Sequence, residues 1–192
     1  GSPMVNAAYS SGTPALGVGV GNAVITVDES ADLDEAAEKI RISKTLDLAA
    51  SCSSDNSVLV LESVYDQMLE KLQAEGGFVV VGEDKQKLQN ILWEDGQLST
   101  KIVAQSAEKL AKMAGIDLPK GKSFYIVPEQ GTGPEYPFSG EKLSVVMTFY
   151  KVKDIDHAIS LTNEIQGYQG QGHSCGIYSY TDANVLKFGM RT

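Results

Sequence analysis

The stretch SVLVLESVYDQMLEKLQAEGGFVVV, residues 57–81, carries the clearest signal of the fold class. Its opening SVLVLE is an apolar run next to polar residues, which is typical of a buried strand. Residues 63–76 then place apolar side chains at helical spacing and end at the glycine pair 76–77, a common helix stop. A second short apolar run, FVVV, follows at 78–81. The order strand, helix, strand predicts one unit of a parallel sheet.

The same alternation extends in both directions along the chain. We expect further strands at residues 22–29, 123–128, 143–152 and 175–181, and helices at 3–11, 32–50, 83–95, 106–115 and 154–166. Helices and strands that alternate in this way predict an α/β fold of three layers, in which helices flank a largely parallel sheet. The length suits one good-sized core, so residues 1–192 are expected to form a single domain.

Composition excludes several functional classes. The net charge of -9 argues against nucleic acid as a partner, because phosphate-binding surfaces carry a basic excess. No run approaches the roughly 20 apolar residues of a membrane span, and the first residues lack the pattern of a secretion signal. Cys52 and Cys175 are too few for a disulfide framework and have no CxxC partner that would suggest zinc. We therefore expect a cytoplasmic protein without a metal site.

Two cysteines and two histidines are the first candidates for chemistry. Cys52 lies in AASCSSDNS, residues 49–57, where it is either a small side chain filling a gap or an accessible nucleophile in a polar turn. Cys175 lies in a strand-like stretch, which favours a structural role. His173 ends a glycine-rich loop, from which an imidazole could move protons in a cleft, whereas His157 lies on the polar face of a helix and is expected to be solvated.

Residue type alone leaves the role of Glu141 undecided, and the glycine-rich stretch 17–22 also needs an interpretation. Glu141 opens a strand after the long loop 129–141, where its carboxylate could bind a sugar hydroxyl or simply face water. The stretch GVGVGN, residues 17–22, has Asn22 where a dinucleotide-binding loop needs its third glycine, and a strand follows where that loop needs a helix. These glycines instead predict a close approach of the backbone to something bulky.

Taken in order, several stretches resemble the catalytic domain of the aldehyde dehydrogenase superfamily, and specifically its CoA-acylating branch. They are AAYSSGTPALGVGVGNAVITVDESADLDEAAEKIRISKT at 7–45, Cys52, NSVLVLESVYD at 56–66, GEKLSVVMTFYKVKD at 140–154 and GQGHSCGIYS at 170–179. The resemblance covers essentially the whole chain and includes the aldehyde dehydrogenase half of bifunctional alcohol/aldehyde dehydrogenases. SCSSDNS, residues 51–57, is most similar to the subgroup that acts on sulfoacetaldehyde.

This resemblance implies a role for five residues. Cys52 would attack the aldehyde and form a thiohemiacetal that collapses to a thioester as hydride leaves for NAD or NADP. Glu141 would bind the nicotinamide ribose and Leu143 would pack near the ring. Gly17 occupies the position of the glutamate base of hydrolytic relatives, so coenzyme A rather than water would accept the acyl group. His173 would accept the proton of the coenzyme A thiol.

The resemblance also has consequences for the chain as a whole. Most of the family's nucleotide-binding domain is expected to lie outside these residues, and its oxyanion-hole asparagine and dimerising arm are not among them. Gly1 and Ser2 fall where a cofactor-contacting helix opens. We therefore expect poor turnover by this chain alone and a homo-oligomeric parent enzyme. Sulfoacetaldehyde is the first expected substrate, ahead of acetaldehyde or another short aldehyde. The alternatives are a non-enzymatic α/β ligand-binding or structural domain and, disfavoured by Gly17, a hydrolytic enzyme.

Overall fold

A single six-stranded sheet organises the computed structural model, which describes residues 2–17 and 19–192. All its pairings are parallel, and the strand order is β3-β6-β7-β2-β1-β8. Its strands are β1 (Ala23–Val27), β2 (Asp55–Leu61), β3 (Gly77–Val79), β6 (Phe124–Glu129), β7 (Val146–Val152) and β8 (Cys175–Tyr178). The predicted parallel sheet is therefore confirmed.

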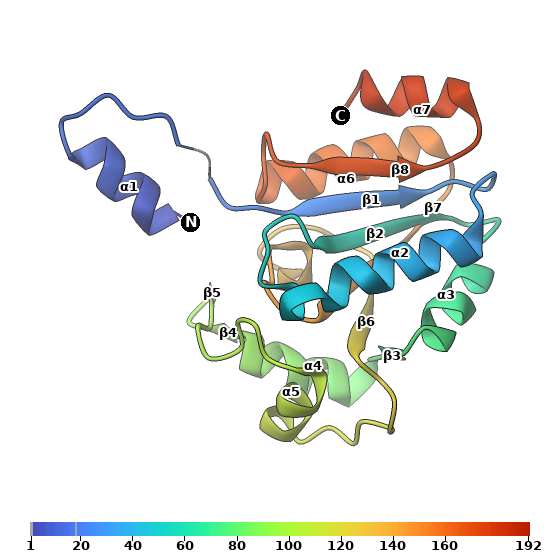
Figure 1. Ribbon diagram of the computed structural model, residues 1–192, viewed down its shortest axis with the longest axis horizontal. Helices are drawn as coiled ribbons and strands as arrows, with labels where there is room; N and C mark the ends of the chain where they lie inside the picture. The colour runs from blue at the N-terminus through green and yellow to red at the C-terminus, as the bar shows by residue number, and fades with distance from the viewer. Residues whose placement is uncertain (1, 18) are drawn as a thin grey trace.

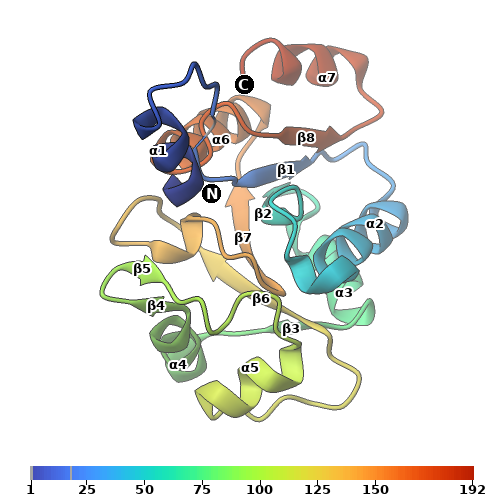
Figure 2. The same cartoon turned by 60° about the vertical axis from the view of Figure 1, so that its left-hand side comes forward.

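Helices cover both faces of this sheet, as Figures 1 and 2 show. The helices of the described residues are α1 (Ser2–Ser10), α2 (Leu33–Thr45), α3 (Tyr65–Ala74), α4 (Gly82–Leu92), α5 (Ala107–Ala114), α6 (Ile155–Tyr168) and α7 (Asp182–Gly189), with short 3-10 turns at Leu46–Ala49 and Pro137–Ser139. Helices α2 and α3 pack on one face, and α6 packs on the other. Helix α1 lies apart from these layers, beyond the amino end of β1 (Figure 1).

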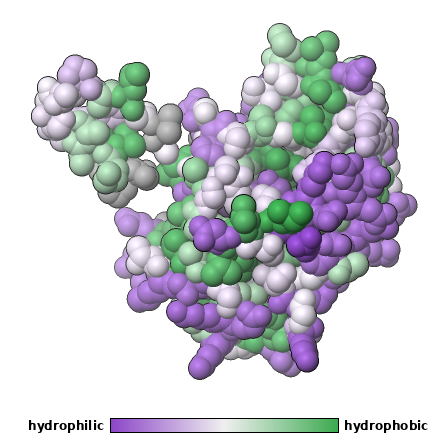
Figure 3. Space-filling model, in the orientation of Figure 1, coloured by the Kyte–Doolittle hydropathy of each residue, from purple (hydrophilic) through white to green (hydrophobic). Residues whose placement is uncertain are grey.

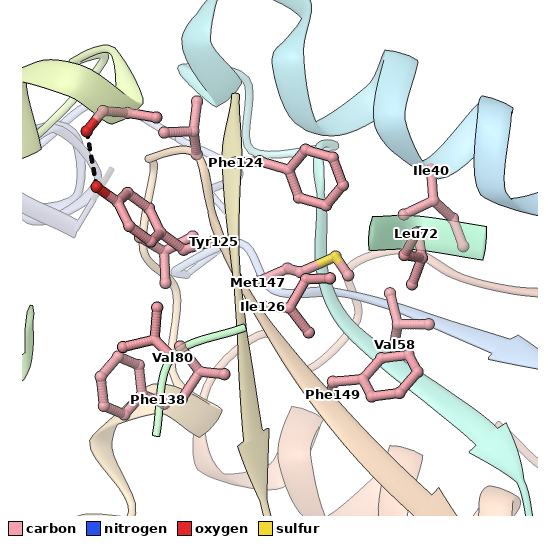
Figure 4. Close-up of a cluster of buried hydrophobic side chains, with 14 of the residues drawn as sticks. Ile40, Val58, Leu72, Val80, Phe124, Tyr125, Ile126, Phe138, Met147 and Phe149 are labelled. Atoms are coloured by element: carbon pink, nitrogen blue, oxygen red, sulfur yellow. Dashed lines mark hydrogen bonds between the residues drawn. The ribbon is translucent and has the colours of Figure 1, made fainter. Parts of the chain in front are cut away.

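The core is built on β2, in which every residue is buried. On one face, Val58 packs with Ile40 of α2 and Leu72 of α3, next to Phe124 and Phe149 (Figure 4). The opposite face of β2 presents Leu59 and Leu61, which pack with Ala158, Leu161 and Ile165 of α6. Because successive side chains of a strand point to opposite faces, a strand buried on both sides reads as a continuous apolar run, as 58–61 does.

One polar group inside the core has its partner. The hydroxyl of Tyr125 in β6 donates to the carbonyl of Ala107 at the start of α5, at 2.7 Å, and this bond is the dashed line in Figure 4. Burial raises the pKa of this tyrosine beyond its ordinary value, so the hydroxyl stays protonated and remains a donor. The bond fixes α5 against the sheet without leaving a buried donor unpaired.

Three parts of the chain differ from the sequence-based expectation. Helix α2 ends at Thr45 rather than at 50, and residues expected at the end of the fourth helix form a two-stranded hairpin, β4 (Trp93–Glu94) and β5 (Gln97–Leu98). Asp95 and Gly96 at its tip have φ of 51° and 74°, as a tight hairpin turn requires. Helix α7 was not predicted, although Thr181 and Asp182 are favourable residues for a helix start.

The surface is largely polar on the face drawn in Figure 3, with apolar residues gathered over α7 at the upper right. Val185, Leu186 and Met190 are exposed there. Within residues 2–17 and 19–192, no helix combines the length and apolar character needed to cross a bilayer.

Candidate active site

The candidate residues gather at the amino ends of four neighbouring strands. Gly21 precedes β1, Cys52 precedes β2, Glu141 precedes β7 and His173 precedes β8. These strands are consecutive in the order β7-β2-β1-β8, so their leading loops meet at one edge. This is the edge opposite to the carboxyl-end crevice in which open α/β sheets usually bind ligands.

Gly21 marks the point where the loops converge. A Cβ atom at Gly21 would lie 2.7 Å from Oε1 of Glu141, 2.8 Å from Cβ of Cys52 and 3.2 Å from Nε2 of His173. The first two distances are shorter than real Cβ atoms show and the third is unusually tight, so a side chain at Gly21 would force its neighbours to move. Groups far apart in the sequence are thereby brought within a few ångströms of one another.

A cavity of about 1060 Å³ opens at this point. Its volume is at the upper end of those that hold cofactors and small ligands. All five residues to which the resemblance assigned a role line it. The lining residues are Val5, Leu16, Gly17, Gly19, Val20, Gly21, Ala50, Ser51, Cys52, Trp93, Gly96, Gln97, Leu98, Glu141, Leu143, Gln169 and His173.

Cys52 is exposed at the top of a serine-rich turn. The N–H of Ser54 donates to the carbonyl of Ser51 at 3.1 Å, and the hydroxyls of Ser51 and Ser53 lie 2.8 Å apart. The turn thus satisfies its own polar groups and leaves the thiol facing the cavity. Cys52 is therefore an accessible group and not a side chain filling a gap.

A left-handed turn leads into the Cys52 turn. Asp47, Leu48 and Ala49 have φ of 50°, 53° and 56°, a region that residues other than glycine rarely adopt. The expected helix 32–50 therefore stops early, because the chain reverses its handedness between the end of α2 and Cys52. Ala49 is buried, which anchors the turn in the body of the domain.

Two buried ionisable residues flank this turn in the sequence. Lys44 in the last turn of α2 is buried, and burial lowers its pKa to about 7, although the negative charge of Asp55 acts to raise that pKa. Burial likewise raises the pKa of Asp55 to about 6, although a hydrogen bond from Ser43 and the charge of Lys44 oppose this shift. Sequence reasoning missed both, since neither stands out among the charged residues of the chain.

Glu141 is half-buried with its carboxylate beside Gly21. Burial raises the pKa of this carboxyl, while a hydrogen bond from the backbone N–H of Gly21 and the charge of Lys142 act in the opposite direction. The held carboxylate offers acceptor oxygens to hydroxyl groups in the cavity. Leu143 adds an apolar surface beside it and itself adopts a positive φ of 41°.

His173 is oriented by its own loop. Its backbone N–H donates to the carbonyl of Gly170 at 2.8 Å, and its Nδ1 lies 3.1 Å from the hydroxyl of Ser174. This leaves Nε2 directed towards Gly21. An imidazole held in this way can exchange a proton with a group in the cavity.

Gly17 allows the close packing that the stretch GVGVGN predicted. A Cβ atom there would lie 2.8 Å from Cγ1 of Val5, and the hydroxyl of Tyr9 bonds both the N–H and the carbonyl of Gly17. The close-approach interpretation of GVGVGN therefore holds for Gly17 and Gly21, whereas Gly19 meets no atom within 4 Å. Val18 of this stretch and Gly1 lie outside the described residues, and Ser2 begins α1 as expected.

No lysine or arginine lines the described part of this cavity. Arg41 instead bonds Glu75 at 2.6 Å, and Arg191 bonds Asp156 at 2.7 Å. Neither arginine is therefore placed to hold an anionic substrate. Neutral donors, namely Ser51, Gln97 and Gln169, line the wall.

The remaining candidates lie elsewhere. His157 is exposed and lines a separate cavity, and its Nδ1 accepts from the N–H of Lys153 at 3.1 Å. Cys175 lies in the edge strand β8 with its Sγ 3.3 Å from the hydroxyl of Thr192. Among the residues that the structure describes, no three His, Cys, Asp or Glu side chains form a group suited to a metal ion.

The hairpin β4–β5 contributes a wall that sequence reasoning missed. Trp93, Gly96, Gln97 and Leu98 all line the cavity, and Trp93 packs edge-on against Phe138 with ring centroids 5.0 Å apart. The dipeptide Asp95–Gly96 between strand-forming residues was the available signal, because it is a strong indicator of a two-residue hairpin.

Comparison with known families identifies the class of protein. The model of the aldehyde dehydrogenase family matches residues 4–192, and the chain belongs to this family. The resemblance on which the site residues were assigned is thus confirmed at the level of the family.

Particular relatives narrow the comparison. The chain is 42% identical to a sulfoacetaldehyde dehydrogenase (acylating) of Cupriavidus necator, over 97% of this chain and 38% of that protein. It is 45% identical to a sulfoacetaldehyde dehydrogenase (acylating) of Bilophila wadsworthia, over 92% of this chain and 39% of that protein. The chain therefore spans about two fifths of the length of these curated relatives.

Solved structures share the fold. An acetylating aldehyde dehydrogenase from Geobacillus thermoglucosidasius superposes with a TM-score of 0.95 at 37% identity, covering 98% of this chain and 42% of that one. A Rhodopseudomonas palustris propionaldehyde dehydrogenase with bound propionyl-CoA gives 0.87 at 25% identity, over 98% and 41% of the two chains. An engineered glycolyl-CoA reductase with bound NADP+ gives 0.87 at 25%, over 98% and 42%.

Proposed function

We propose that this chain is the nucleophile-bearing domain of a CoA-acylating aldehyde dehydrogenase. The observation that supports it most is the convergence of Cys52, Glu141 and His173 around Gly21 in one cavity. A thiol, a proton acceptor and a held carboxylate are the groups that thioester chemistry on an aldehyde needs. The acylating relatives and the CoA-bound structure agree with this assignment.

The first half of the proposed reaction takes place on Cys52. Its thiolate attacks the aldehyde carbon, and as the S–C bond forms the π electrons of the carbonyl move onto oxygen, which gives the thiohemiacetal as its oxyanion. The C–H bond then breaks with its electron pair while the oxyanion re-forms the carbonyl, which leaves a thioester on Cys52. The nicotinamide, when bound, supplies the acceptor for that hydride.

The cavity suits such a cofactor at one wall. The half-buried carboxylate of Glu141 presents acceptor oxygens for ribose hydroxyls, and Leu143 presents an apolar surface for a flat ring. Gly19 meets nothing within 4 Å, so the backbone there can be approached closely by a ligand. NAD and NADP are both compatible with these residues.

The second half of the proposed reaction passes the acyl group to coenzyme A. Nε2 of His173 would take the proton of the incoming thiol, whose sulfur attacks the thioester, and the S–C bond to Cys52 breaks. Glu141 is the only carboxylate among the described lining residues, and its bond to Gly21 engages it. Among the described lining residues no second carboxylate is available to activate water, which favours acyl transfer over hydrolysis.

For the aldehyde we propose sulfoacetaldehyde, with acetaldehyde as the next candidate. This follows the names of the two relatives at 42% and 45% identity. In this cavity a sulfonate would be held by the neutral donors of Ser51, Gln97 and Gln169. Substitution of Gln97 by leucine should then raise KM for sulfoacetaldehyde more than KM for acetaldehyde.

We also propose that most of the nucleotide-binding domain lies outside these residues. The chain matches 38% and 39% of the length of the two relatives, which leaves room for another domain in them. The chain alone should then catalyse acyl transfer between thiols, which needs no nicotinamide, far better than aldehyde oxidation.

The test of the proposed function uses acyl transfer, the half of the reaction that needs no nicotinamide. The 192-residue chain is incubated with acetyl-CoA, and acylation is located by mass spectrometry, with Cys52→Ala and Cys175→Ala as a matched pair. We expect an acetyl group on Cys52 in the wild type and in Cys175→Ala, removed again by free CoA, and none at this site in Cys52→Ala.

Two outcomes would contradict the proposal. Acylation that Cys52→Ala leaves unchanged would remove Cys52 from the reaction. Failure of Cys52 to react with either acetyl-CoA or iodoacetamide would favour the non-enzymatic, ligand-binding alternative, because a catalytic thiol should react well ahead of Cys175.

A further inference from the structure

The loops of the candidate site are joined underneath by buried polar side chains. Asn22, Asn56 and Lys142 are at most 3% exposed, and Gln169 is half-buried at the cavity wall. We call these four residues the buried polar network. Each is a near neighbour in sequence of a site residue: Asn22 of Gly21, Asn56 of Cys52, Lys142 of Glu141 and Gln169 of His173.

The two asparagines form the centre of the buried polar network. Nδ2 of Asn56 donates to Oδ1 of Asn22 and, at 2.8 Å, to the carbonyl of Gly140. Nδ2 of Asn22 donates to the carbonyls of Ser139 and Gln169 at 2.9 and 3.0 Å. The amide pair therefore links the amino ends of β1 and β2 to the loops that precede β7 and β8.

Lys142 and Gln169 extend these links towards Glu141. Nζ of Lys142 donates to the carbonyls of Phe138 and Gly140 at 2.5 and 2.9 Å, and Oε1 of Gln169 accepts from the N–H of Glu141 at 2.9 Å. Burial holds the pKa of Lys142 well below its ordinary value. The backbone on both sides of the Glu141 carboxylate is thus fixed from beneath.

Two glycines permit the close packing of these parts. A Cβ atom at Gly140 would lie 2.7 Å from Oε1 of Gln169, and one at Gly170 would lie 2.5 Å from Cβ of Asn22. A side chain at either glycine would therefore push Gln169 or Asn22 out of its place in the network. Buried polar groups that replace apolar packing add little net stability but define a unique arrangement of the chain around them.

We propose that Asn22 and Asn56 are positioning residues, whose amide pair sets the separation of Cys52, Glu141 and His173 around Gly21. This inference rests on the proposed function, since it assigns the pair a role in acyl transfer. The amides touch no substrate and act through the loops that they join. Misplacement of reacting groups by about 1 Å can lower a rate on the order of 100-fold, so loss of the pair should affect chemistry more than folding.

The test exchanges a donor for an acceptor. Asn56→Asp keeps the shape of the side chain but replaces Nδ2 with an oxygen that faces two acceptors, Oδ1 of Asn22 and the carbonyl of Gly140. Asn90→Asp is the matched control, because Asn90 is exposed and uses only its Oδ1 as an acceptor, from Gln86. Asn22→Ala, which removes the donor to the carbonyls of Ser139 and Gln169 without placing a charge in the network, is the second variant in case Asn56→Asp does not fold.

Each protein is compared with the wild type for acetyl transfer from acetyl-CoA to Cys52, over a range of acetyl-CoA concentrations and below its unfolding midpoint. We expect the saturating rate to fall on the order of 100-fold in the network variants, with the half-saturating concentration little changed and Asn90→Asp at the wild-type rate. A purely structural role would lower the unfolding midpoint and leave the rate of the folded protein intact, and that result would overturn the proposal.

Alkylation of Cys52 by iodoacetamide separates failure of this inference from failure of the proposed function. If wild-type Cys52 is not acylated, the proposed function fails, and the positioning role is judged on alkylation alone. A several-fold change in the rate of Cys52 alkylation in the network variants, with the rate at Cys175 unaffected, would support the positioning role. Equal alkylation of Cys52 in the wild type and the variants would then refute it.

Discussion

Gly21 is the residue around which the candidate site is arranged, because the side chains of Cys52, Glu141 and His173 occupy the space beside it. The loops that carry these three side chains are far apart in sequence, and they can approach one another because Gly21 has no Cβ atom. The family resemblance named Cys52, Glu141 and His173 as candidates from their motifs, and the structure places these three beside Gly21. The resemblance did not single out Gly21, since a glycine that is needed for space looks like any other until its neighbours are known.

Adding a methyl group at Gly21 should therefore disrupt the site directly. In Gly21→Ala the new Cβ would lie under 3 Å from both Glu141 and Cys52, so those side chains must move apart. We expect acetyl transfer to Cys52 to fall on the order of 100-fold, measured by mass spectrometry over time. Gly167→Ala is the control, because a Cβ there meets no atom within 4 Å, and it should keep the wild-type rate.

The buried Lys44 makes stability depend on pH in a defined direction. Its folded pKa of about 7 lies below its value of 10.5 in the unfolded chain, so between these values the unfolded state binds a proton that the folded state has released. Stability therefore rises with pH above about 7, by up to about 1.4 kcal/mol per pH unit. Asp55, raised to about 6 from 3.8, has the opposite effect, but only at lower pH.

Lys44→Met removes the cost of burying this charge. We expect the variant to be more stable than the wild type at pH 7, with the difference shrinking by about 2 kcal/mol between pH 7 and pH 9. Urea unfolding at several pH values measures it. Lys112→Met, on the exposed side of α5, should differ from the wild type in free energy of unfolding by the same amount at every pH. A difference that does not change with pH for Lys44→Met would refute the lowered pKa of Lys44.

At the level of elements, the turn between α2 and β2 is the most unusual feature. Leu48 has φ of 53° and is 38% exposed, so its conformation costs free energy without being required by a buried side chain. Strain of this kind, about 1–2 kcal/mol per residue, persists where the surrounding structure imposes it. Here it redirects the chain so that Cys52 faces the cavity.

Glycine at this position should relieve the strain. We expect Leu48→Gly to raise the free energy of unfolding by about 0.5–1 kcal/mol, after allowing for the greater freedom of glycine in the unfolded chain. Leu46→Gly is the matched control, since Leu46 is also exposed but has φ of -60°, and it should be destabilising. Destabilisation by both substitutions in a denaturant titration would count against strain at Leu48.

Most elements were predictable because their apolar spacing is regular. The strands at 22–29 and 57–62 and the helix at 63–76 were located to within a few residues, since burial on two faces leaves a clear run of apolar side chains. Helix α2 was predicted too long because Leu46 continues the helical spacing of its apolar residues. This spacing gives no sign that the backbone turns left-handed at 47–49. The hairpin β4–β5 was hidden by the helical pattern that precedes it.

At the level of the whole molecule, the parallel sheet was predictable and its strand order was not. Alternating helices and strands favour parallel pairing, but the order β3-β6-β7-β2-β1-β8 depends on packing between distant parts of the chain. The site depends on that order, because only adjacent β7, β2, β1 and β8 bring its four loops together. Without the family resemblance, the sequence offered separate candidates and not a site.

In the proposed function, Cys52 carries an acyl group from an aldehyde to coenzyme A. The first measurement to make is nicotinamide reduction by an enzyme that joins this chain to a nicotinamide nucleotide-binding domain. Sulfoacetaldehyde and acetaldehyde are each supplied with and without CoA, and with Cys52→Ala beside the wild type. We predict sustained reduction only when both CoA and Cys52 are present. Sustained reduction without CoA, or in Cys52→Ala, would refute this role of Cys52.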